Sequence, residues 1–511
     1  MKNTRKLKKA VLKPETPPTP FETHCQALSE ADRKELALFF SDIDSHLILP
    51  KPEKFKILSD FKTALLYYDS VGISLDIALE RLSAENLGGF YARPPMLWYA
   101  LDDAAKIYPL SMQRGYMAVF RLSVRFKQNV VPELLQMALS FTIKRFPSFA
   151  TTVKKGFFWH YLDTSKRRYN VEPESDIPCR PLQVSRSGSQ SFRVIYHNNR
   201  VSVEFFHVLT DGTGGMTFLK TLTAEYLRLL GVEWSKADGV LNINDIPTKS
   251  ETANDFLRAE KAEAISGYMD KHAVQMSGKY SKMRFCRVLH FKMDAAKLKD
   301  TAKNKNATIT AYILALMFIA GKNATDELKG DINIQVPVNM RKFYPSDTVR
   351  NFAMYCGIRL PIDSITETAS IINEISSQLA QKASKESMCE MVNSTGRMVR
   401  LIRFVPLSIK AGVAKIGYGF LGDQIFSNTL SNLGVIKMPP QMAEHIDGMD
   451  FVLGTYNKAS CAMGTFENTT VLSITKTTAD PSFEEKLYSL LLADGLAITV
   501  EGSELEGSEL L

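Results

Sequence analysis

A histidine and an aspartate four positions apart in the stretch 205–215, His207 and Asp211, are the side chains best placed to do chemistry. The β-branched and aromatic run 201–206 predicts a strand that ends at His207. A neutral imidazole there can accept a proton from an alcohol, amine or thiol, because its unperturbed pKa is close to 7. Asp211 is predicted to fix the loop, and Gly212 to allow a tight turn with positive φ.

The alternative for such a histidine is a buried side chain satisfied by backbone groups. The strand before His207, and the Asp-Gly pair and predicted helix 214–230 after it, favour the catalytic interpretation. The other seven histidines lack this setting, and we interpret them as structural or surface residues. They are His24, His46, His160, His197, His272, His290 and His445.

The elements around this segment alternate between strands and helices, which predicts a mixed α/β fold. Apolar residues at helical spacing predict further helices at 131–145, 294–304, 308–321, 365–383 and 483–494. Shorter β-type runs predict strands at 117–124, 192–196, 288–291, 331–337, 357–360, 451–456, 459–466 and 469–476.

Composition and charge describe a globular chain. Of the 511 residues, 45% are hydrophobic and 23% are charged, which excludes a mainly disordered or fibrous protein. The net charge is +8, and residues 1–20 contribute +5 of it, which leaves +3 for the rest. A body this close to neutral argues against a nucleic-acid partner.

Targeting and metal-binding signals are weak. The basic N-terminus is not followed by an apolar segment of a secretory signal, and the apolar run 311–321 is too short to span a bilayer. The six cysteines form no CxxC pair, so we expect no metal site, no disulfide framework and a cytoplasmic protein with reduced thiols. These cysteines are Cys25, Cys179, Cys286, Cys356, Cys389 and Cys461.

The HxxxDG sequence 207–212 after a strand resembles the acyltransferase motif of the chloramphenicol acetyltransferase-like superfamily. That superfamily includes plant-type alcohol acyltransferases, carnitine acyltransferases and the condensation domains of peptide synthetases. The resemblance covers roughly residues 96–500. Further matching segments, in the expected order, are 98–109, similar to the opening of bacterial alcohol acetyltransferase-like proteins, Arg145-Phe146-Pro147, Val336-Pro337-Val338-Asn339-Met340-Arg341, Arg350-Asn351-Phe352 and Ser431-Asn432-Leu433-Gly434.

The sequence departs from the motifs of two branches of this superfamily, which narrows the branch that it resembles. Condensation domains usually carry HHxxxDG, and Phe206 stands in place of the first histidine, which favours a free-standing acyltransferase. The DFGWG box of plant-type enzymes is absent, which weakens assignment to that branch.

The resemblance implies two similar lobes of mixed sheets flanked by helices, with an active-site channel between them, behind an N-terminal helical extension. The predicted organisation is a disordered basic tail at 1–28, a helical extension at 29–95, an N-terminal lobe at 96–250, a crossover linker at 251–284, a C-terminal lobe at 285–500 and an acidic, frayed tail at 501–511.

The resemblance also implies a reaction. His207 acts as general base on a hydroxyl or amine of a small acceptor, which attacks the thioester of acyl-CoA, a co-substrate rather than a bound cofactor. Asp211 points away from substrate and pairs with Arg341. Ser431 is a candidate oxyanion donor, with an ordinary loop serine as the equally weighted alternative.

Other interpretations stay open. The acyl donor could be a carrier-protein thioester, as in lipid or peptide assembly, or the chain could be an inactive scaffold that keeps the fold. The GxGxxG match at 417–422 lacks a following helix, because 423–428 resembles a strand, so we expect no dinucleotide. The basic amphipathic segment 397–415 predicts either a packed helix with a solvated face or one that contacts a membrane surface or a CoA phosphate.

Overall fold

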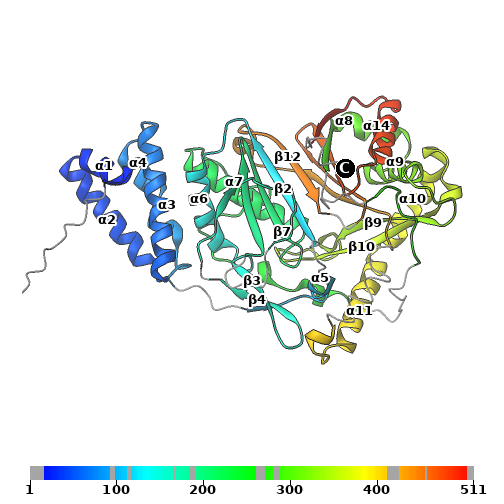
Figure 1. The fold of residues 1–511 in the computed structure, drawn as a ribbon, viewed down its shortest axis with the longest axis horizontal. Helices are drawn as coiled ribbons and strands as arrows, with labels where there is room; N and C mark the ends of the chain where they lie inside the picture. The colour runs from blue at the N-terminus through cyan, green and yellow to red at the C-terminus, as the bar shows by residue number, and fades with distance from the viewer. Residues whose placement is uncertain are drawn as a thin grey trace, which may run out of the picture.

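The computed structural model describes residues 17–92, 98–111, 117–165, 167–182, 190–260, 271–279, 287–410, 425–454 and 457–502. Within these ranges it contains no helix both long and apolar enough to cross a bilayer. Its elements form an N-terminal helical layer, two large sheets with helices packed on them and a third, small sheet (Figure 1).

The N-terminal layer consists of α1 (Pro20–Ala27), α2 (Glu30–His46), α3 (Lys51–Ser70) and α4 (Leu75–Arg81). Thr19 caps α1 in a reciprocal capping box with Glu22, and Ser29 caps α2. The layer packs on the first lobe, where the Tyr68 hydroxyl of α3 donates to the carbonyl of Leu229 at 2.7 Å. Its apolar side chains belong to the same buried cluster as the core of that lobe.

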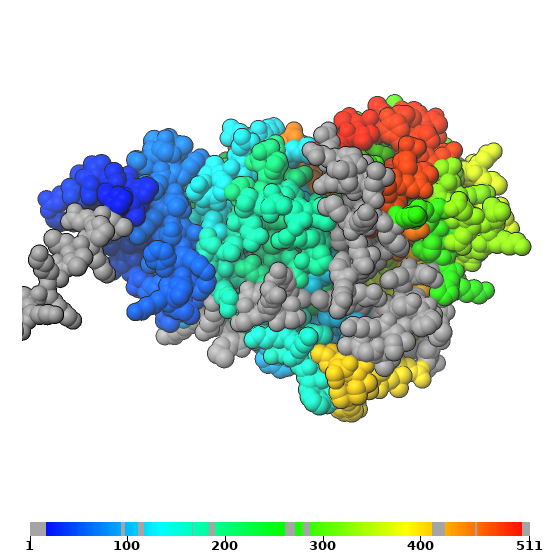
Figure 2. Space-filling view, viewed as in Figure 1, coloured from blue at the N-terminus to red at the C-terminus, as the bar shows by residue number. Residues whose placement is uncertain are grey.

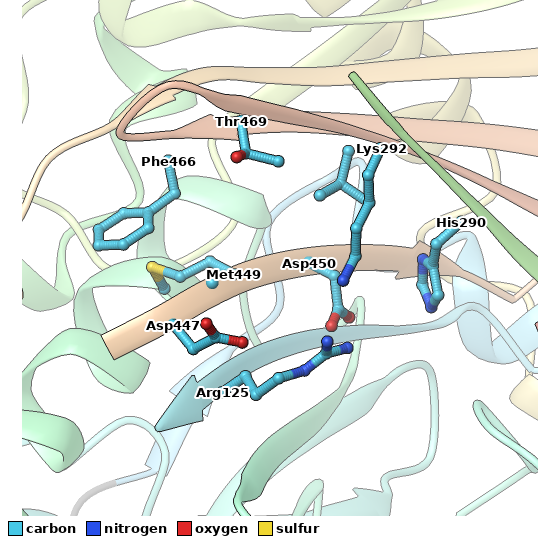
Figure 3. A pocket seen from close by; sticks show the side chains of 10 residues that line it. Arg125, His290, Lys292, Asp447, Met449, Asp450, Phe466 and Thr469 are labelled. Carbon is cyan, nitrogen blue, oxygen red and sulfur yellow. The ribbon is translucent and has the colours of Figure 1, made fainter. Parts of the chain in front are cut away.

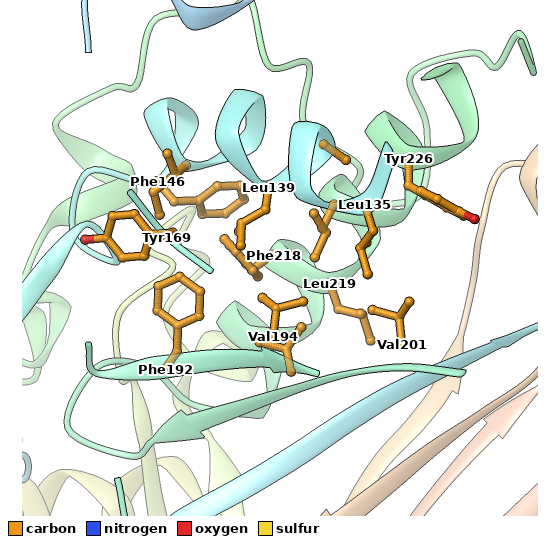
Figure 4. Close-up of a cluster of buried hydrophobic side chains, with 14 of the residues drawn as sticks. Leu135, Leu139, Phe146, Tyr169, Phe192, Val194, Val201, Phe218, Leu219 and Tyr226 are labelled. Carbon is orange, nitrogen blue, oxygen red and sulfur yellow. The ribbon is translucent and has the colours of Figure 1, made fainter. Parts of the chain in front are cut away.

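The first sheet has the strand order β12-β2-β7-β6-β5. Its strands are β2 (Val119–Phe126), β5 (Val171–Pro173), β6 (Phe192–His197), β7 (Arg200–Phe206) and β12 (Ile446–Leu453). Helices α6 (Pro132–Thr142) and α7 (Gly212–Leu229) lie over one face and bury Leu139, Phe218 and Leu219 against Phe192 and Val194 (Figure 4).

The second sheet has the order β10-β9-β11-β13-β14-β8-β15. Its strands are β8 (Arg287–Asp294), β9 (Asp331–Asn339), β10 (Ala353–Pro361), β11 (Asn428–Ile436), β13 (Ala459–Phe466), β14 (Thr469–Lys476) and β15 (Thr499–Gly502). The helices of this half are α8 (Ala295–Asn304), α9 (Ile309–Asn323), α10 (Thr368–Lys382), α11 (Lys385–Leu401), α13 (Pro440–Ala443) and α14 (Ser482–Ala493). Helix α9 is almost wholly buried, because α10 and α14 pack on it.

A third, small sheet has the order β1-β4-β3, from β1 (Trp98–Ala100), β3 (Thr151–Lys155) and β4 (His160–Thr164). Helix α5 (Tyr108–Ser111) follows β1. Short 3₁₀ helices lie at Ala84–Leu87, Ile143–Arg145, Ser250–Thr252, Asp255–Arg258, Met340–Lys342 and Ile362–Ser364.

Strand β12 interlocks the two halves. It lies in the range assigned by sequence to the second lobe, but it pairs antiparallel with β2 and forms the edge of the first sheet. The chain therefore crosses from the second lobe into the first and returns to it at β13.

The end of the chain differs from the frayed tail predicted from residue 501 onward. Strand β15 pairs antiparallel with β8, and Glu501 stands opposite His290. The Glu501 carboxylate pairs with Arg125 at 3.0 Å and also with Lys292. Glu501 and Gly502 are thus part of the second sheet, because two cations offset the acidic charge that suggested a tail.

Candidate active site

His207 is positioned by the sheet. It follows β7 directly, and β7 is held between β2 and β6. The His207 backbone N–H donates to the carbonyl of Ala118 at 2.8 Å, which extends the β2–β7 pairing one residue past Phe206. Because an inner strand is paired on both sides, its end holds a substrate-binding side chain in a rigid position.

Two aromatic rings hold the imidazole. The Tyr108 ring stacks on it with centroids 5.0 Å apart, and the Phe120 ring meets it edge-on at 5.3 Å. The side chain is half-buried, and Nδ1 is buried without a hydrogen bond to another described residue. Tyr108 lies in the matching segment 98–109, but its stacking on His207 was not predicted.

Burial in this surrounding favours the neutral form of His207. Burial lowers its pKa below the ordinary imidazole value, and the Asp211 carboxylate and the backbone of His207 itself raise it only in part. The neutral imidazole has one nitrogen that can accept a proton, and Nδ1 has no hydrogen bond within the described part of the chain. The arrangement suits a general base near pH 7.

The Asp211 carboxylate is turned toward the protein scaffold and makes no hydrogen bond to His207. One oxygen, Oδ1, accepts from the N–H of Gly214 at 2.9 Å and so caps α7. The other, Oδ2, accepts from Nη1 of Arg341 and from the N–H of Phe352, each at 2.7 Å. Both oxygens are occupied, and two of the three donors come from the second lobe.

Arg341 connects the second lobe to the loop between β7 and α7, which contains Asp211. Beyond Asp211, its Nη2 donates to the carbonyls of Thr348 at 2.7 Å and Arg350 at 3.0 Å. The ion pair is largely withdrawn from solvent, with side chains 11% and 3% exposed for Arg341 and Asp211. A charge-assisted pair in such surroundings is strong when every donor has an acceptor.

Gly212 does not have the positive φ that its place in an Asp-Gly pair suggested. It is instead the first residue of α7, and a Cβ at this position would lie 2.7 Å from Cδ2 of Leu433. A side chain at this position would therefore require the Leu433 side chain of β11 to shift. Sequence reasoning therefore identified the residue but gave the wrong reason.

Gly214 has a tighter constraint that sequence reasoning missed. A Cβ there would lie 2.1 Å from the carbonyl oxygen of Val349 and 2.3 Å from Oγ1 of Thr210. The Thr210 hydroxyl donates to that same carbonyl at 2.6 Å. The backbone of the second lobe is thus packed directly onto the motif, and the glycine-rich entry to α7 was the signal that could have found it.

Ser431 lies on a strand and not in the predicted loop. It is half-buried on β11 and pairs with Ala462 of β13, with an irregularity in the pairing between Asn432 and Val435. No hydrogen bond joins it to His207. Its neighbour Leu433 contacts the start of α7, so β11 brings this segment to the edge of the site.

Two buried residues of opposite charge, Asp102 and Arg350, hold the segment that carries Tyr108 through backbone groups. Arg350 donates to the carbonyl of Ala100 at 2.7 Å, and Asp102 accepts from the N–H of Ala105 at 2.7 Å. Burial raises the pKa of Asp102 to about 6, and the Arg350 charge opposes that rise. The stacking ring is therefore held from the second lobe as well as the first.

A cavity of about 150 Å³ lies elsewhere, between the two sheets (Figure 3). Arg125 of β2 and Asp450 of β12 face His290 and Lys292 of β8 across it. Nδ1 of His290 and the hydroxyl of Ser473 share a hydrogen bond of 2.9 Å. His207 is not among its lining residues. The acidic side chains Asp447 and Asp450 of the cavity offset the charges of Arg125 and Lys292.

Two other sequence signals have different outcomes. The GxGxxG match lies outside the described residues. In the basic segment, Lys410 is buried, donates to the carbonyl of Phe158 at 2.8 Å and lies 3.3 Å above the Trp159 ring, so it does not belong to a solvated face. Lys415 also lies outside the described residues.

Solved structures share this architecture. The first condensation domain of the calcium-dependent antibiotic synthetase, in complex with a substrate analogue, has a TM-score of 0.53 at 13% identity, over 79% of this chain and 99% of that chain. TRI101 of Fusarium sporotrichioides, complexed with coenzyme A and T-2, has 0.52 at 11%, over 79% and 99%. Polyketide synthase associated protein 5 from Mycobacterium tuberculosis has 0.51 at 12%, over 78% and 96%.

No model of a protein family matches the sequence, and no curated protein matches it. At identities this low the structural likeness shows the fold, which is the predicted two-lobed mixed α/β architecture.

Proposed function

We propose that this chain, which has the chloramphenicol acetyltransferase-like fold, is an acyl-CoA-dependent acyltransferase. It moves an acetyl or longer acyl group from a thioester to the hydroxyl, or an amine, of a small acceptor. The observation that carries the proposal is the placement of His207 at the end of β7, against the rings of Tyr108 and Phe120, while the motif aspartate is turned away into the scaffold.

In the proposed reaction, Nε2 of His207 takes the proton of the acceptor hydroxyl as its oxygen attacks the thioester carbonyl. The tetrahedral intermediate carries a negative oxygen, for which the Ser431 hydroxyl on β11 is the proposed donor. The C–S bond then breaks, and the imidazolium returns the proton to the departing thiolate. The products are an ester and the free thiol of CoA, and His207 is restored.

The two rings next to His207 have a positioning role in this proposal. Tyr108 and Phe120 fix the imidazole plane and keep water from its flanks. Burial of the imidazole lowers its pKa, which favours the base form. A correctly oriented base contributes typically 10²–10⁴-fold in rate.

Coenzyme A as donor is supported by the similarly folded TRI101, which was solved with coenzyme A. The condensation-domain likeness supports a second donor, a carrier-protein thioester. Phe206 is the observation against that alternative, because it occupies the place of the first histidine of HHxxxDG.

The test follows thiol release from acetyl-CoA and longer acyl-CoAs with a panel of alcohols and amines. We expect turnover by the wild type, its loss in His207→Ala, and its retention in His197→Ala, a matched control at the exposed β6–β7 turn. Equal background release by wild type and His207→Ala with every pair tried would refute the enzyme proposal. Turnover with an acyl-carrier donor alone would select the carrier alternative.

A further inference from the structure

An exposed apolar surface lies where the chain leaves α11 of the second lobe next to the β3–β4 hairpin of the first lobe. It is formed by the end of α11 and the segment after it, together with the tip of the β3–β4 hairpin. Its most exposed large side chains are Phe157 (72%), Leu401 (77%), Phe404 (71%) and Ile409 (55%). We call these four residues the Phe157/Phe404 patch.

The patch is one continuous surface, although its parts are about 240 residues apart in sequence. The Phe158 ring contacts the Phe404 ring at 6.0 Å and the Phe157 ring at 4.8 Å. The N–H of Leu407 donates to the carbonyl of Phe157 at 2.9 Å. Figures 1 and 2 show the hairpin and the end of α11 side by side at the lower edge of the molecule.

Three exposed arginines accompany the patch at helical spacing, Arg397, Arg400 and Arg403. Residues 391–410 contain no Asp or Glu, and none of the three arginines has an ion pair within the described part of the chain. The carboxylate of Asp103 lies near Arg400 at Gly396, but it is already paired with Lys106 at 2.7 Å. The surface is therefore both apolar and cationic.

The patch is held firmly. Lys410 fixes the hairpin tip through the carbonyl of Phe158 and the face of the Trp159 ring. Lys106 also lies over that ring, at 5.4 Å, and it belongs to the segment whose Tyr108 stacks on His207. A preformed patch loses little conformational entropy on binding.

We propose that the Phe157/Phe404 patch docks on the surface of a bilayer that contains anionic lipids. Phenylalanine and leucine side chains next to arginines are the composition of interfacial segments, which bury the apolar groups at the acyl boundary and pair the cations with headgroups. A second copy of the chain fits less well, because a two-fold contact through the same patch would bring two sets of three arginines together.

The experiment measures flotation of the full chain with vesicles of phosphatidylcholine alone or with 30% phosphatidylserine. The six basic residues of the segment 1–20 are replaced by Gln in every variant, so that this segment does not contribute. We expect binding to the anionic vesicles, roughly a hundredfold weaker partitioning for Arg397→Gln/Arg400→Gln/Arg403→Gln, and about tenfold for each of Phe157→Ser and Phe404→Ser.

The matched control is Ile246→Ser/Leu328→Ser, which removes two side chains that are each 87% exposed outside the patch. It should partition like the parent. Failure of the parent to bind, equal binding to both vesicle types, or unchanged binding by the patch variants would each overturn the proposal. So would a dimer in light scattering without lipid that Phe404→Ser converts to a monomer, because that would make the patch an interface between copies.

Discussion

Replacing Asp211 with asparagine separates two roles of the motif carboxylate, holding the loop and moving protons. The change is nearly isosteric, and one oxygen remains to cap α7 through the Gly214 N–H. The new amide NH₂ then faces Nη1 of Arg341 and the N–H of Phe352. All three groups are hydrogen-bond donors, so Arg341 and Phe352 lose their acceptor. The expected result is a loss of stability.

The magnitude follows from the burial of the pair. Breaking a buried ion pair costs about 3–5 kcal/mol. Arg341 keeps its bonds to the carbonyls of Thr348 and Arg350, which places the expected cost at the lower end, about 3 kcal/mol. At about 2.1 cal/mol/K per residue, 511 residues unfolding together have an unfolding entropy near 1 kcal/mol/K, so the thermal midpoint should fall by about 3 °C.

The assay is thermal unfolding of four proteins: wild type, Asp211→Asn, Arg341→Gln and the double variant. We expect the double variant to lose clearly less than the two single losses combined, with a coupling of about 2 kcal/mol. Asp294→Asn is the matched control, because Asp294 caps α8 through the N–H of Lys297 at 2.7 Å but is exposed. Its midpoint should change by well under 1 °C, since Asn and Asp cap equally well.

An Asp211→Asn protein with an unchanged midpoint and additive single losses would refute the structural role. The pH profile provides a second readout. Because the Asp211 charge raises the pKa of His207, removing it should move the acidic limb of turnover further toward low pH. A limb that vanished would instead mean that Asp211 itself is the titrating group.

Turnover should fall as pH drops through the pKa of His207, which burial places below the ordinary value of about 6.5. The same burial makes the folded state less stable in acid, so His207→Ala should reduce the fall of the thermal midpoint with acidity, measured across pH 4–8. Gly212→Ala should lower the midpoint by about 1 °C and be rescued by Leu433→Ala, whereas Gly214→Ala should not be rescued and should yield little folded protein, because its Cβ meets the backbone carbonyl of Val349. Glu204→Gln should cost about 3 kcal/mol, seen as a midpoint about 3 °C lower, because its fully buried carboxylate serves two arginines; a shift below 1 °C would contradict this.

Local sequence pattern predicted the elements whose limits are set by their own residues. Strands β13 and β14 have the predicted bounds, because Glu467, with φ of 50°, and Asn468 form a turn between two β-type runs. The strand that delivers His207 and the helix that follows it were predicted in the same way. In each case the signal lies within about twenty residues.

Local sequence pattern could not predict which strands pair when they are far apart in the sequence. Strand β12 joins the first sheet through β2, which lies more than 300 residues earlier, and nothing in its own pattern distinguishes one sheet from the other. Strand β15 was hidden by the acidic composition of the chain end. Its Glu501 has a pKa lowered to about 2, with Arg125 and Lys292 outweighing the effect of burial, so the partners decide its placement.

The motif itself shows why local and distant information combine at this site. His207 is fixed by a neighbouring strand, but Thr210, Asp211 and Gly212 each contact the second lobe, through Val349, Arg341 and Leu433. The loop geometry therefore requires both lobes to be docked. A substitution that loosens this docking should disable His207 without touching it, because a small displacement of a catalytic group is enough to lose its rate contribution.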